Sequence, residues 1–416
     1  MRKLLFLSHR IPYPPNKGDK IRSFHILKHL ASQFDIFLGC FYEDAAEARH
    51  IEALRPYCSD LLALQIAPAQ KFLRAAKGLS LGTSMSEAVY ADRRMSAWVR
   101  KTLEEQKIAD VFVFCSAMTP YLTGHASGRT LIFDFVDVDS AKWDAYAASA
   151  KPPLGWCFSV EKRRVGTLEA AAAAVGDNIV LASHAEAELL RRLLPRSKSS
   201  IRVVENGVDA DEFDPAVACA NPFEGTALPI VFTGAMDYRP NIDAVEWFAR
   251  NVFPAIRREF ASAQFWIVGY RPAASVRRLG RDPGVHVTGE VFDVRPFLRH
   301  GACVVSPLRI ARGVQNKVLE AMAMGKPAVV TPAALEGLGA GHGREVLVAA
   351  GAEGFARAVM EVLSGKWQGL GSAARAYVRR HHDWTTTLQA IDRLFGEDVE
   401  TNSPERELAA VSAGSQ

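Results

Sequence analysis

The chain has 416 residues, 49% of them hydrophobic, which is more apolar material than one core holds, so two domains are expected. The net charge of +4 excludes the strong basic bias of a nucleic-acid-binding protein, although local basic patches remain for phosphates or a membrane. Six cysteines without C-x-x-C or zinc spacing predict reduced thiols in a cytoplasmic protein. Neither a signal peptide nor a membrane-spanning helix is expected.

Short apolar runs alternate with helical patterns through the first half of the chain. A helix is expected over residues 19–34, and the expected strands cover residues 3–8, 36–41, 111–115, 130–136, 179–182 and 201–205. Alternation of this kind is typical of a parallel sheet with helices on both faces.

The same alternation starts again near residue 229. Strands are expected over 229–234, 264–268, 285–287, 302–306 and 328–331, and helices over 243–260, 314–324, 355–363, 372–381 and 384–395. We therefore predict an α/β protein with two Rossmann-like domains, 1–205 and 206–383, in which a last helix over 384–396 returns to the first domain. The tail 397–416 lacks periodicity and is expected to be disordered. Ligands bind beyond the carboxyl ends of such strands, so the candidate site is a cleft between the domains.

The segment 306–331 is the most informative part of the chain. It places Lys317 and Glu320 on one face of a helix that opens after Gly313. A helix start offers unpaired N–H groups and partial positive charge for a phosphate, while a carboxylate one turn later can bind sugar or ribose hydroxyls. Two arginines precede this start, Arg309 and Arg312. The plain alternative is an exposed Lys–Glu helix pair without function.

Two further loops follow predicted strands. The first, over residues 9–24, is basic through His9, Arg10, Lys17, Lys20 and Arg22. In it, Gly18 permits a close backbone approach and Asp19 is a plausible N-cap. The second runs from Gly234 to Asn241, where Arg239 and Asn241 are available to a phosphate. An ordinary solvated loop is the alternative for the first, and a helix cap at Asn241 for the second.

Asp137 and Asp139 follow the strand over 130–136 and form a D-x-D pair. Such a pair can hold Mg²⁺ or Mn²⁺ in sugar transferases, but short matches of this kind also arise by chance at strand ends. We expect no metal, and a role in the cleft for Asp137 alone.

Taken together, these residues resemble the retaining, nucleotide-sugar-dependent glycosyltransferases of family 4, and within them the subgroup associated with exosortase and exopolysaccharide systems. The resemblance runs from residue 6 to about 395, and is most specific over 206–209, 232–241, 267–269 and 313–331. It implies a GT-B fold in which the second domain holds the donor and the first domain holds the acceptor.

The resemblance also implies roles for single residues. Glu320 matches the second glutamate of an E-x7-E pair that hydrogen-bonds ribose, and Lys317 lies where a phosphate-facing group is expected. Gly18 matches a glycine beside the diphosphate, and Asp137 falls near the position of a histidine close to the donor sugar. The backbone from Gly289 to Val291 matches a loop that reads the base.

The chain departs from the family pattern at the donor site. Arg312 replaces the first glutamate of the pair, while Ala235 and Pro240 stand where the family usually has arginine and lysine. Neutralisation of the diphosphate is therefore expected from other cations, namely Arg239, Arg309, Arg312 and Lys317.

The implied reaction is the metal-independent transfer of a hexosyl unit, with retention, from a nucleoside diphosphate sugar to a glycan acceptor. The acceptor is expected to be lipid-linked, and Lys71, Arg74 and Lys77 beside Phe72 and Leu73 suggest contact with an anionic inner membrane. No other cofactor and no nucleic acid are expected. The rival functions are a nucleotide-sugar epimerase of the same fold and a non-catalytic two-domain protein that binds sugars or phosphates.

Overall fold

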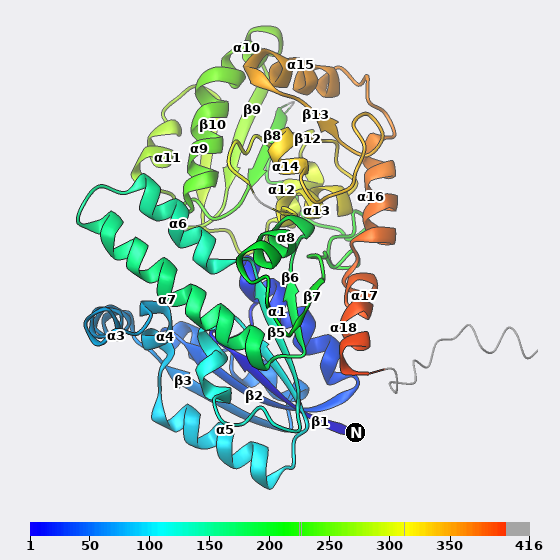
Figure 1. Ribbon diagram of the computed structural model, residues 1–416. Coiled ribbons are helices and arrows are strands. Elements are labelled where there is room, and N and C mark those ends of the chain that lie inside the picture. Colours follow the sequence, from blue (N-terminus) through cyan, green and yellow to red (C-terminus); the bar gives the residue numbers. More distant parts are fainter. Residues whose placement is uncertain (224, 226, 312, 397–416) are drawn as a thin grey trace, which may run out of the picture.

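The computed structural model describes residues 1–223, 225, 227–311 and 313–396, and the tail expected to be disordered lies outside them. Within these residues the chain forms two parallel sheets, one in each half (Figure 1). The first has the order β3-β2-β1-β4-β5-β6-β7, and the second β10-β9-β8-β11-β12-β13. The predicted α/β architecture of two Rossmann-like units is confirmed.

The first sheet is built around β1, whose residues from Leu4 to Leu7 are fully buried, as expected for a strand covered on both faces. Its strands are β1 (Arg2–Ser8), β2 (Phe34–Tyr42), β3 (Asp60–Gln65), β4 (Asp110–Phe114), β5 (Thr130–Val136), β6 (Asn178–Leu181) and β7 (Ser200–Val203). Its helices are α1 (Gly18–Ala31), α2 (Ala45–Ala48), α3 (Pro68–Leu81), α4 (Met85–Tyr90), α5 (Arg93–Glu105), α6 (Asp139–Ser149), α7 (Leu154–Val175) and α8 (His184–Leu193), with 3-10 turns at Glu52–Tyr57 and Ser116–Leu122.

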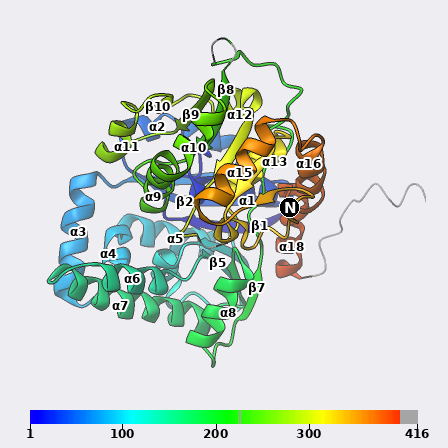
Figure 2. The ribbon, with the colours of Figure 1, turned by 90° about the horizontal axis from the view of Figure 1, so that it is seen from above.

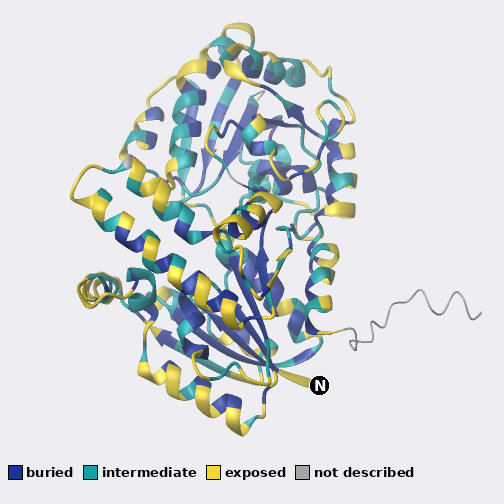
Figure 3. Ribbon diagram, in the orientation of Figure 1, coloured by how far each residue is buried: buried dark blue, intermediate teal, exposed yellow. Residues whose placement is uncertain are grey.

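The second sheet is likewise buried along its inner strands, while its covering helices keep exposed outer faces (Figure 3). Its strands are β8 (Leu228–Thr233), β9 (Ala263–Val268), β10 (Val285–Gly289), β11 (Cys303–Ser306), β12 (Ala328–Val330) and β13 (Leu347–Val348). Its helices are α9 (Arg239–Trp247), α10 (Phe253–Glu259), α11 (Ala274–Leu279), α12 (Arg295–His300), α13 (Asn316–Ala323), α14 (Pro332–Leu335), α15 (Gly351–Leu363) and α16 (Leu370–His381).

The chain crosses between the two halves twice, at neighbouring points. The N–H of Val208 donates to the carbonyl of His382 at 2.8 Å, and the N–H of Trp384 donates back to the carbonyl of Val208 at 3.3 Å. At Gly207 an added Cβ would lie 2.8 Å from the Trp384 ring, so this contact requires glycine. The closing segments α17 (Trp384–Thr387), α18 (Gln389–Asp392) and the 3-10 turn Arg393–Phe395 then pack against the core of the first sheet.

Two predicted helices are interrupted. The helix expected over 243–260 begins earlier, at Arg239, and is divided into α9 and α10 by a π-helical turn, Phe248–Val252. Pro254 lacks the N–H of a regular helix, which accounts for the break. The closing helix expected over 384–395 is likewise divided into three short pieces.

Candidate active site between the two sheets

The floor of the site is made by two glycines that touch at the ends of neighbouring strands. Gly234 follows β8 and Gly269 follows β9, and both have φ of +151°. A Cβ added to Gly269 would lie 1.7 Å from the carbonyl oxygen of Gly234. Only glycine can hold this conformation and this close contact. The carboxyl ends of β8 and β9 are therefore bare of side chains, where a ligand of an α/β sheet is expected.

Lys317 lies above this floor. It stands in the first turn of α13, with its Nζ 2.5 Å from Asn241 Oδ1 and 4.3 Å from the centre of the Phe232 ring. A Cβ on Gly234 would lie 3.1 Å from the same ammonium. Burial lowers the pKa of Lys317 to about 7, against the opposing effect of Glu320. An anion bound here would gain a charged partner in a poorly hydrated position.

Asn241 is a positioning residue for this lysine. It is the third residue of α9, whose N-cap is Tyr238, so the interpretation of Asn241 as a helix cap is wrong. Its side-chain amide donates to the carbonyl of Ala235 at 2.9 Å, and its oxygen accepts from Lys317. Asn241 thereby joins the loop after β8 to the start of α13.

Glu320 stands one turn after Lys317 on the same helix and is half-buried. Burial raises the pKa of its carboxyl to about 7, Lys317 works against this rise, and the nearby Glu212 adds to it. Lys317 and Glu320 are thus not a solvated surface pair. A carboxyl that is easily protonated can both donate to and accept from a sugar or ribose hydroxyl.

The arginines that we expected beside Lys317 are placed differently. Arg309 makes a paired contact with Asp243 on α9, with its Nε 2.9 Å from Oδ2, and its guanidinium lies 5.9 Å from the Trp247 ring. Arg239 is exposed at the start of α9. Arg312 lies outside the described residues. Lys317 is therefore the predicted cation that the structure brings to the glycine floor.

The predicted base-reading loop adjoins the same floor. Gly289 ends β10 with φ of +72°, at a point where the pairing register with β9 shifts. Its carbonyl accepts from the N–H of Gly269 at 3.3 Å, and a Cβ on Gly289 would meet no atom within 4 Å. Val291 is partly buried against the neighbouring hydrophobic cluster. Gly289, Gly269 and Gly234 thus follow one another across three strand ends.

Two contacts show that loops of the first half lie next to the glycine floor and the start of α13. Lys17, in the loop before α1, places its Nζ 5.6 Å from the centre of the Tyr270 ring, which follows β9. Gly313, with φ of +64°, lies beside Ser183, since an added Cβ would be 3.5 Å from the Ser183 Cβ. A Cβ on Gly18 would meet no atom within 4 Å, so the space in front of Gly18 is open. Gly18 and Gly313 therefore both lie near the junction between the halves.

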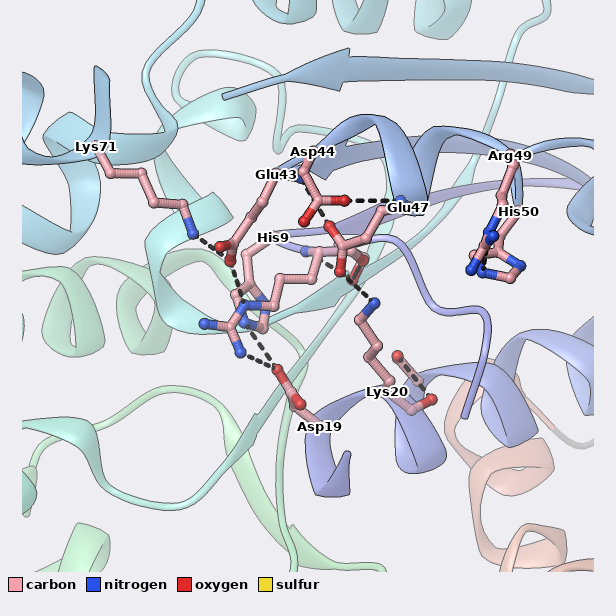
Figure 4. Close-up of polar contacts among 12 residues, drawn as sticks. His9, Asp19, Lys20, Glu43, Asp44, Glu47, Arg49, His50 and Lys71 are labelled. Carbon is pink, nitrogen blue, oxygen red and sulfur yellow. Dashed lines mark hydrogen bonds and ion pairs between the residues drawn. The ribbon is translucent and has the colours of Figure 1, made fainter. Parts of the chain in front are cut away.

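Carboxylates pair with several of the basic side chains of the first loop (Figure 4). Arg10 lies 2.7 Å from Asp19, and His9 lies 3.6 Å from the same carboxylate. Asp19 is therefore not the N-cap that we expected; Lys17 occupies that position in α1 without a side-chain cap. Burial alone would lower the pKa of His9, but Cys115 and Asp19 outweigh it and raise this pKa to about 9.

Two other cations of this loop are buried rather than presented to a ligand. Lys20 lies 2.6 Å from Glu47 (Figure 4). Arg22 is fully buried, donating to Asp134 at 2.8 Å and to Asn206 at 3.1 Å. All five basic side chains contribute to the charge of this loop in the sequence, but Lys20 and Arg22 are paired with carboxylates inside the protein. Arg22 instead connects α1, the end of β5 and the junction between the halves.

Asp137 lies at the end of β5 and is not joined to the Lys317 group by any contact among described residues. Lys142 Nζ lies 2.9 Å from Asp137 and 3.2 Å from Asp139, so one lysine occupies the D-x-D pair. Within the described part of the chain, no group of three or more Asp, Glu, His or Cys side chains is arranged to hold a metal ion. Asp137 remains a prediction for a catalytic role in the cleft, close to the donor sugar.

Sequence reasoning missed Tyr270 and Glu212. Tyr270 follows the glycine motif at 267–269 directly, so its place after a strand was the available signal. Glu212, which raises the pKa of Glu320, stands in a segment without periodicity, and nothing local indicated it.

Residues 228–365 match the family model described as Glycosyl transferases group 1. No curated protein sequence matches the chain. Among the described residues, no helix is long and apolar enough to cross a membrane.

Solved structures of similar fold include HepE of Anabaena in complex with UDP, with 15% identity, 94% of this chain and 98% of that chain covered, and a TM-score of 0.62. Sucrose-phosphate synthase of Thermosynechococcus elongatus has 15% identity, 99% and 100% coverage, and a TM-score of 0.68. WaaG, a glycosyltransferase involved in lipopolysaccharide biosynthesis, has 15% identity, 94% and 100% coverage, and a TM-score of 0.65. The chain therefore has the GT-B fold, and its second half carries the sequence pattern of the group 1 glycosyl transferases.

Proposed function

We propose that the chain is a retaining glycosyltransferase that moves a hexosyl unit from a nucleoside diphosphate sugar to a glycan acceptor in exopolysaccharide biosynthesis. The observation that carries this proposal is Lys317, held by Asn241 over the bare strand ends at Gly234. The match of residues 228–365 to group 1 glycosyl transferases supports the activity. HepE, which shares the fold, has been solved with UDP and with UDP-glucose, which supports a nucleoside diphosphate donor.

In this proposal the diphosphate lies across the start of α13. Lys317 and the free N–H groups of the helix start neutralise the charge that develops when the bond between the anomeric carbon and the diphosphate oxygen breaks. The acceptor hydroxyl attacks the same face of the sugar, and its proton passes to the departing phosphate oxygen. Glu320 binds donor hydroxyls, and Gly289 and Val291 face the base. Arg239 and Arg312 supply further positive charge, whereas Arg309 is already paired with Asp243.

The first test is a thermal-shift panel of nucleotide sugars, run with and without a chelator. We expect at least one nucleoside diphosphate sugar to raise the melting temperature, with no effect of the chelator. Lys317→Ala should abolish this shift and lower turnover by about 100-fold or more. If no nucleotide raises the melting temperature, or if Lys317→Ala keeps normal turnover, the proposed donor site is wrong.

Two rival functions remain distinguishable by product analysis. A nucleotide-sugar epimerase of the same fold would convert the donor with no acceptor present, whereas a transferase requires an acceptor. A two-domain binding protein would bind sugar or phosphate without turnover of either kind. Incubation of each donor that gives a thermal shift, with and without a lipid-linked glycan, separates the three functions.

We also propose that the acceptor is lipid-linked and that the first half meets the cytoplasmic face of an anionic membrane through an exposed apolar surface. This surface consists of Phe72, Leu73 and Leu81 on α3 and Leu154 and Trp156 at the start of α7, with exposed fractions from 53% to 76%. In Figures 1 and 2, α3 and the turn between α6 and α7 project on the same side of the molecule. Apolar side chains on a helix of this kind suit the interfacial region of a bilayer.

The three basic residues expected to contact the membrane, Lys71, Arg74 and Lys77, are not all free to do so. Lys71 pairs with Glu43 at 2.5 Å, and Arg74 donates to the carbonyl of Val89 at 3.0 Å, so both side chains turn toward the protein. Lys77 is exposed. The apolar side chains are therefore the stronger support for membrane contact.

Liposome flotation with anionic lipid tests the contact. The triple variant Phe72→Ser/Leu73→Ser/Trp156→Ser should no longer float with the liposomes, because three exposed apolar side chains are removed. The matched control is Leu193→Ser/Val217→Ser, which removes exposed apolar side chains elsewhere. Equal flotation of the two variants would show that this surface is not the membrane contact.

A further inference from the structure

A cavity, which we call the flank cavity, lies at the opposite end of α13 from Lys317. It has a volume of about 640 Å³ and is bounded by α16, the last turn of α12, the segment Met324–Lys326 and Pro215. Because α13 has eight residues, its two ends are separated by about 12 Å. In Figure 1, α16 runs along the outer flank of the second half, beside α13. The flank cavity is thus separate from the glycine floor.

Four cationic side chains line the flank cavity, Arg299, Lys326, Arg375 and Arg379. Arg375 is paired with Asp214 at 2.9 Å. Arg379 lies 3.6 Å from Asp211, a carboxylate with 88% of its side chain exposed, so this pair neutralises little. The other two cations have no carboxylate partner within the described part of the chain. The flank cavity therefore carries an excess of positive charge.

Lys326 is the most unusual of the four. It follows Gly325, whose φ of +64° ends α13, and its backbone N–H donates to the carbonyl of Ala321 at 3.0 Å. Its half-buried side chain makes no hydrogen bond or ion pair with any described residue. Burial and the neighbouring Arg299 both lower the pKa of this ammonium. A half-buried cation beside a second cation is costly in free energy, and a bound anion would remove that cost.

The N-terminal turn of α16 adds to this environment. The helix begins at Leu370, has twelve residues, and presents Ser372, Arg375 and Arg379 to the flank cavity on one face. Residues at this spacing lie one above another along a helix. The start of a helix carries partial positive charge, and the Ser372 hydroxyl can donate to an oxygen of an anion.

We propose that the flank cavity binds a small anion that carries two or more phosphate groups. Lys326 and Arg299 contact its oxygens directly, Arg379 adds charge at the rim, and Ser372 donates from the start of α16. The volume exceeds what a single phosphate fills, which favours a chain of phosphates with or without a nucleoside. The proposal does not depend on the function assigned to the cleft.

Occupancy of the flank cavity should also affect the segment that joins the two halves. Arg299 donates to the carbonyl of Val217, and Arg375 donates to the carbonyl of Phe213 at 2.9 Å. Both carbonyls belong to the joining segment. A bound anion restrains Arg299, which donates to the Val217 carbonyl, so amide hydrogen exchange across residues 211–219 should slow when the ligand is added.

The experiment titrates inorganic tripolyphosphate by calorimetry into Lys317→Ala, a variant in which the cleft cation is absent. We expect binding to persist in this variant and to weaken at least tenfold when Lys326→Gln/Arg379→Gln is added. The matched control is Arg258→Gln/Arg278→Gln, which removes two exposed charges from the same half of the chain. This control should bind within twofold of Lys317→Ala. A nucleoside triphosphate in a parallel titration separates a plain polyphosphate from a nucleotide ligand.

Three results would overturn the proposal. Tripolyphosphate binding that vanishes in Lys317→Ala would place the only site in the cleft. Equal weakening by both double substitutions would show diffuse attraction to the surface rather than a site. Unchanged exchange at 211–219 on addition of ligand would show that the flank cavity is not occupied. If the first double variant melts early, Lys326→Gln alone replaces it, because the Lys326 side chain has no hydrogen-bond or ion-pair partner among the described residues to lose.

Discussion

Lys317 Nζ lies 2.5 Å from Asn241 Oδ1, although 76 residues separate the two along the chain. This bond joins the first turn of α13 to the third residue of α9, and both helices begin beside the bare end of β8. Asn241 therefore decides where the cation at the proposed donor site stands. This contact joins the two segments that form the proposed phosphate-binding surface.

Asn241→Ala should weaken donor binding. Removal of the oxygen that accepts from Lys317 leaves the ammonium free to move away from the diphosphate, at a cost of about 1.5–3 kcal/mol. We expect the Kd of a nucleoside diphosphate sugar to rise about tenfold or more in calorimetry. Asn241→Asp is the informative companion, because a carboxylate beside Lys317 should weaken anion binding further. Wild-type affinity in both variants would remove Asn241 from the site.

Donor affinity should fall as the pH rises through about 7. Burial holds the pKa of Lys317 at about 7, so the free protein loses this positive charge above neutrality. A bound diphosphate favours the charged form, and binding at high pH must therefore take up a proton. The diphosphate of a nucleotide sugar does not itself titrate near neutrality, so the dependence reports on the protein.

Lys317→Arg provides the control for this pH dependence. Arginine remains charged throughout the range, so its donor affinity should fall less between pH 6 and 9 than that of the lysine form, even if it is weaker at pH 6. Glu320, with a pKa raised to about 7, is present in both proteins and does not affect the comparison. Parallel profiles for the lysine and arginine forms would show that Lys317 does not cause the dependence.

Gly269→Ala should destabilise the second half strongly. The added Cβ would lie 1.7 Å from the Gly234 carbonyl oxygen at a φ of +151°, so backbone must shift. We expect a loss of about 3 kcal/mol or more in urea unfolding. Gly354→Ala, in α15, is the matched control, because its Cβ would meet no atom within 4 Å. Equal stability of the two variants would contradict the close contact between the strand ends.

Much of this arrangement is visible in the sequence. The continuous apolar runs of β1, β8 and β11 are the pattern of strands buried on both faces, and glycine or polar residues after them indicate the ligand edge. Lys317 and Glu320 were placed together by helical spacing alone. The missed strand β3 is half-exposed at the sheet edge, and its Leu and Ala residues favour helix as much as strand.

The contacts between distant segments could not be predicted in this way. Three ion pairs neutralise charges that the local sequence would suggest are available to a ligand. They are Arg10 with Asp19, Arg309 with Asp243, and Lys142 with Asp137. Which charges remain free depends on side chains brought together by the tertiary fold. The flank cavity shows the same limit, since Arg299, Lys326 and Arg379 come from three separate helices or helix ends.

The last prediction concerns Arg22, which is fully buried and bound to Asp134 and Asn206. Asp134→Ala should cost about 3–5 kcal/mol in urea unfolding, because it leaves a buried guanidinium without its carboxylate. Arg22→Met/Asp134→Leu should recover most of that stability, since no buried charge remains. The double variant still lacks the bond from Arg22 to Asn206 at the junction between the halves. We therefore expect faster amide exchange at residues 206–209 in a protein that unfolds at nearly wild-type urea concentration. Wild-type exchange at the junction would show that Arg22 stabilises only the first half and does not restrain how the two halves meet.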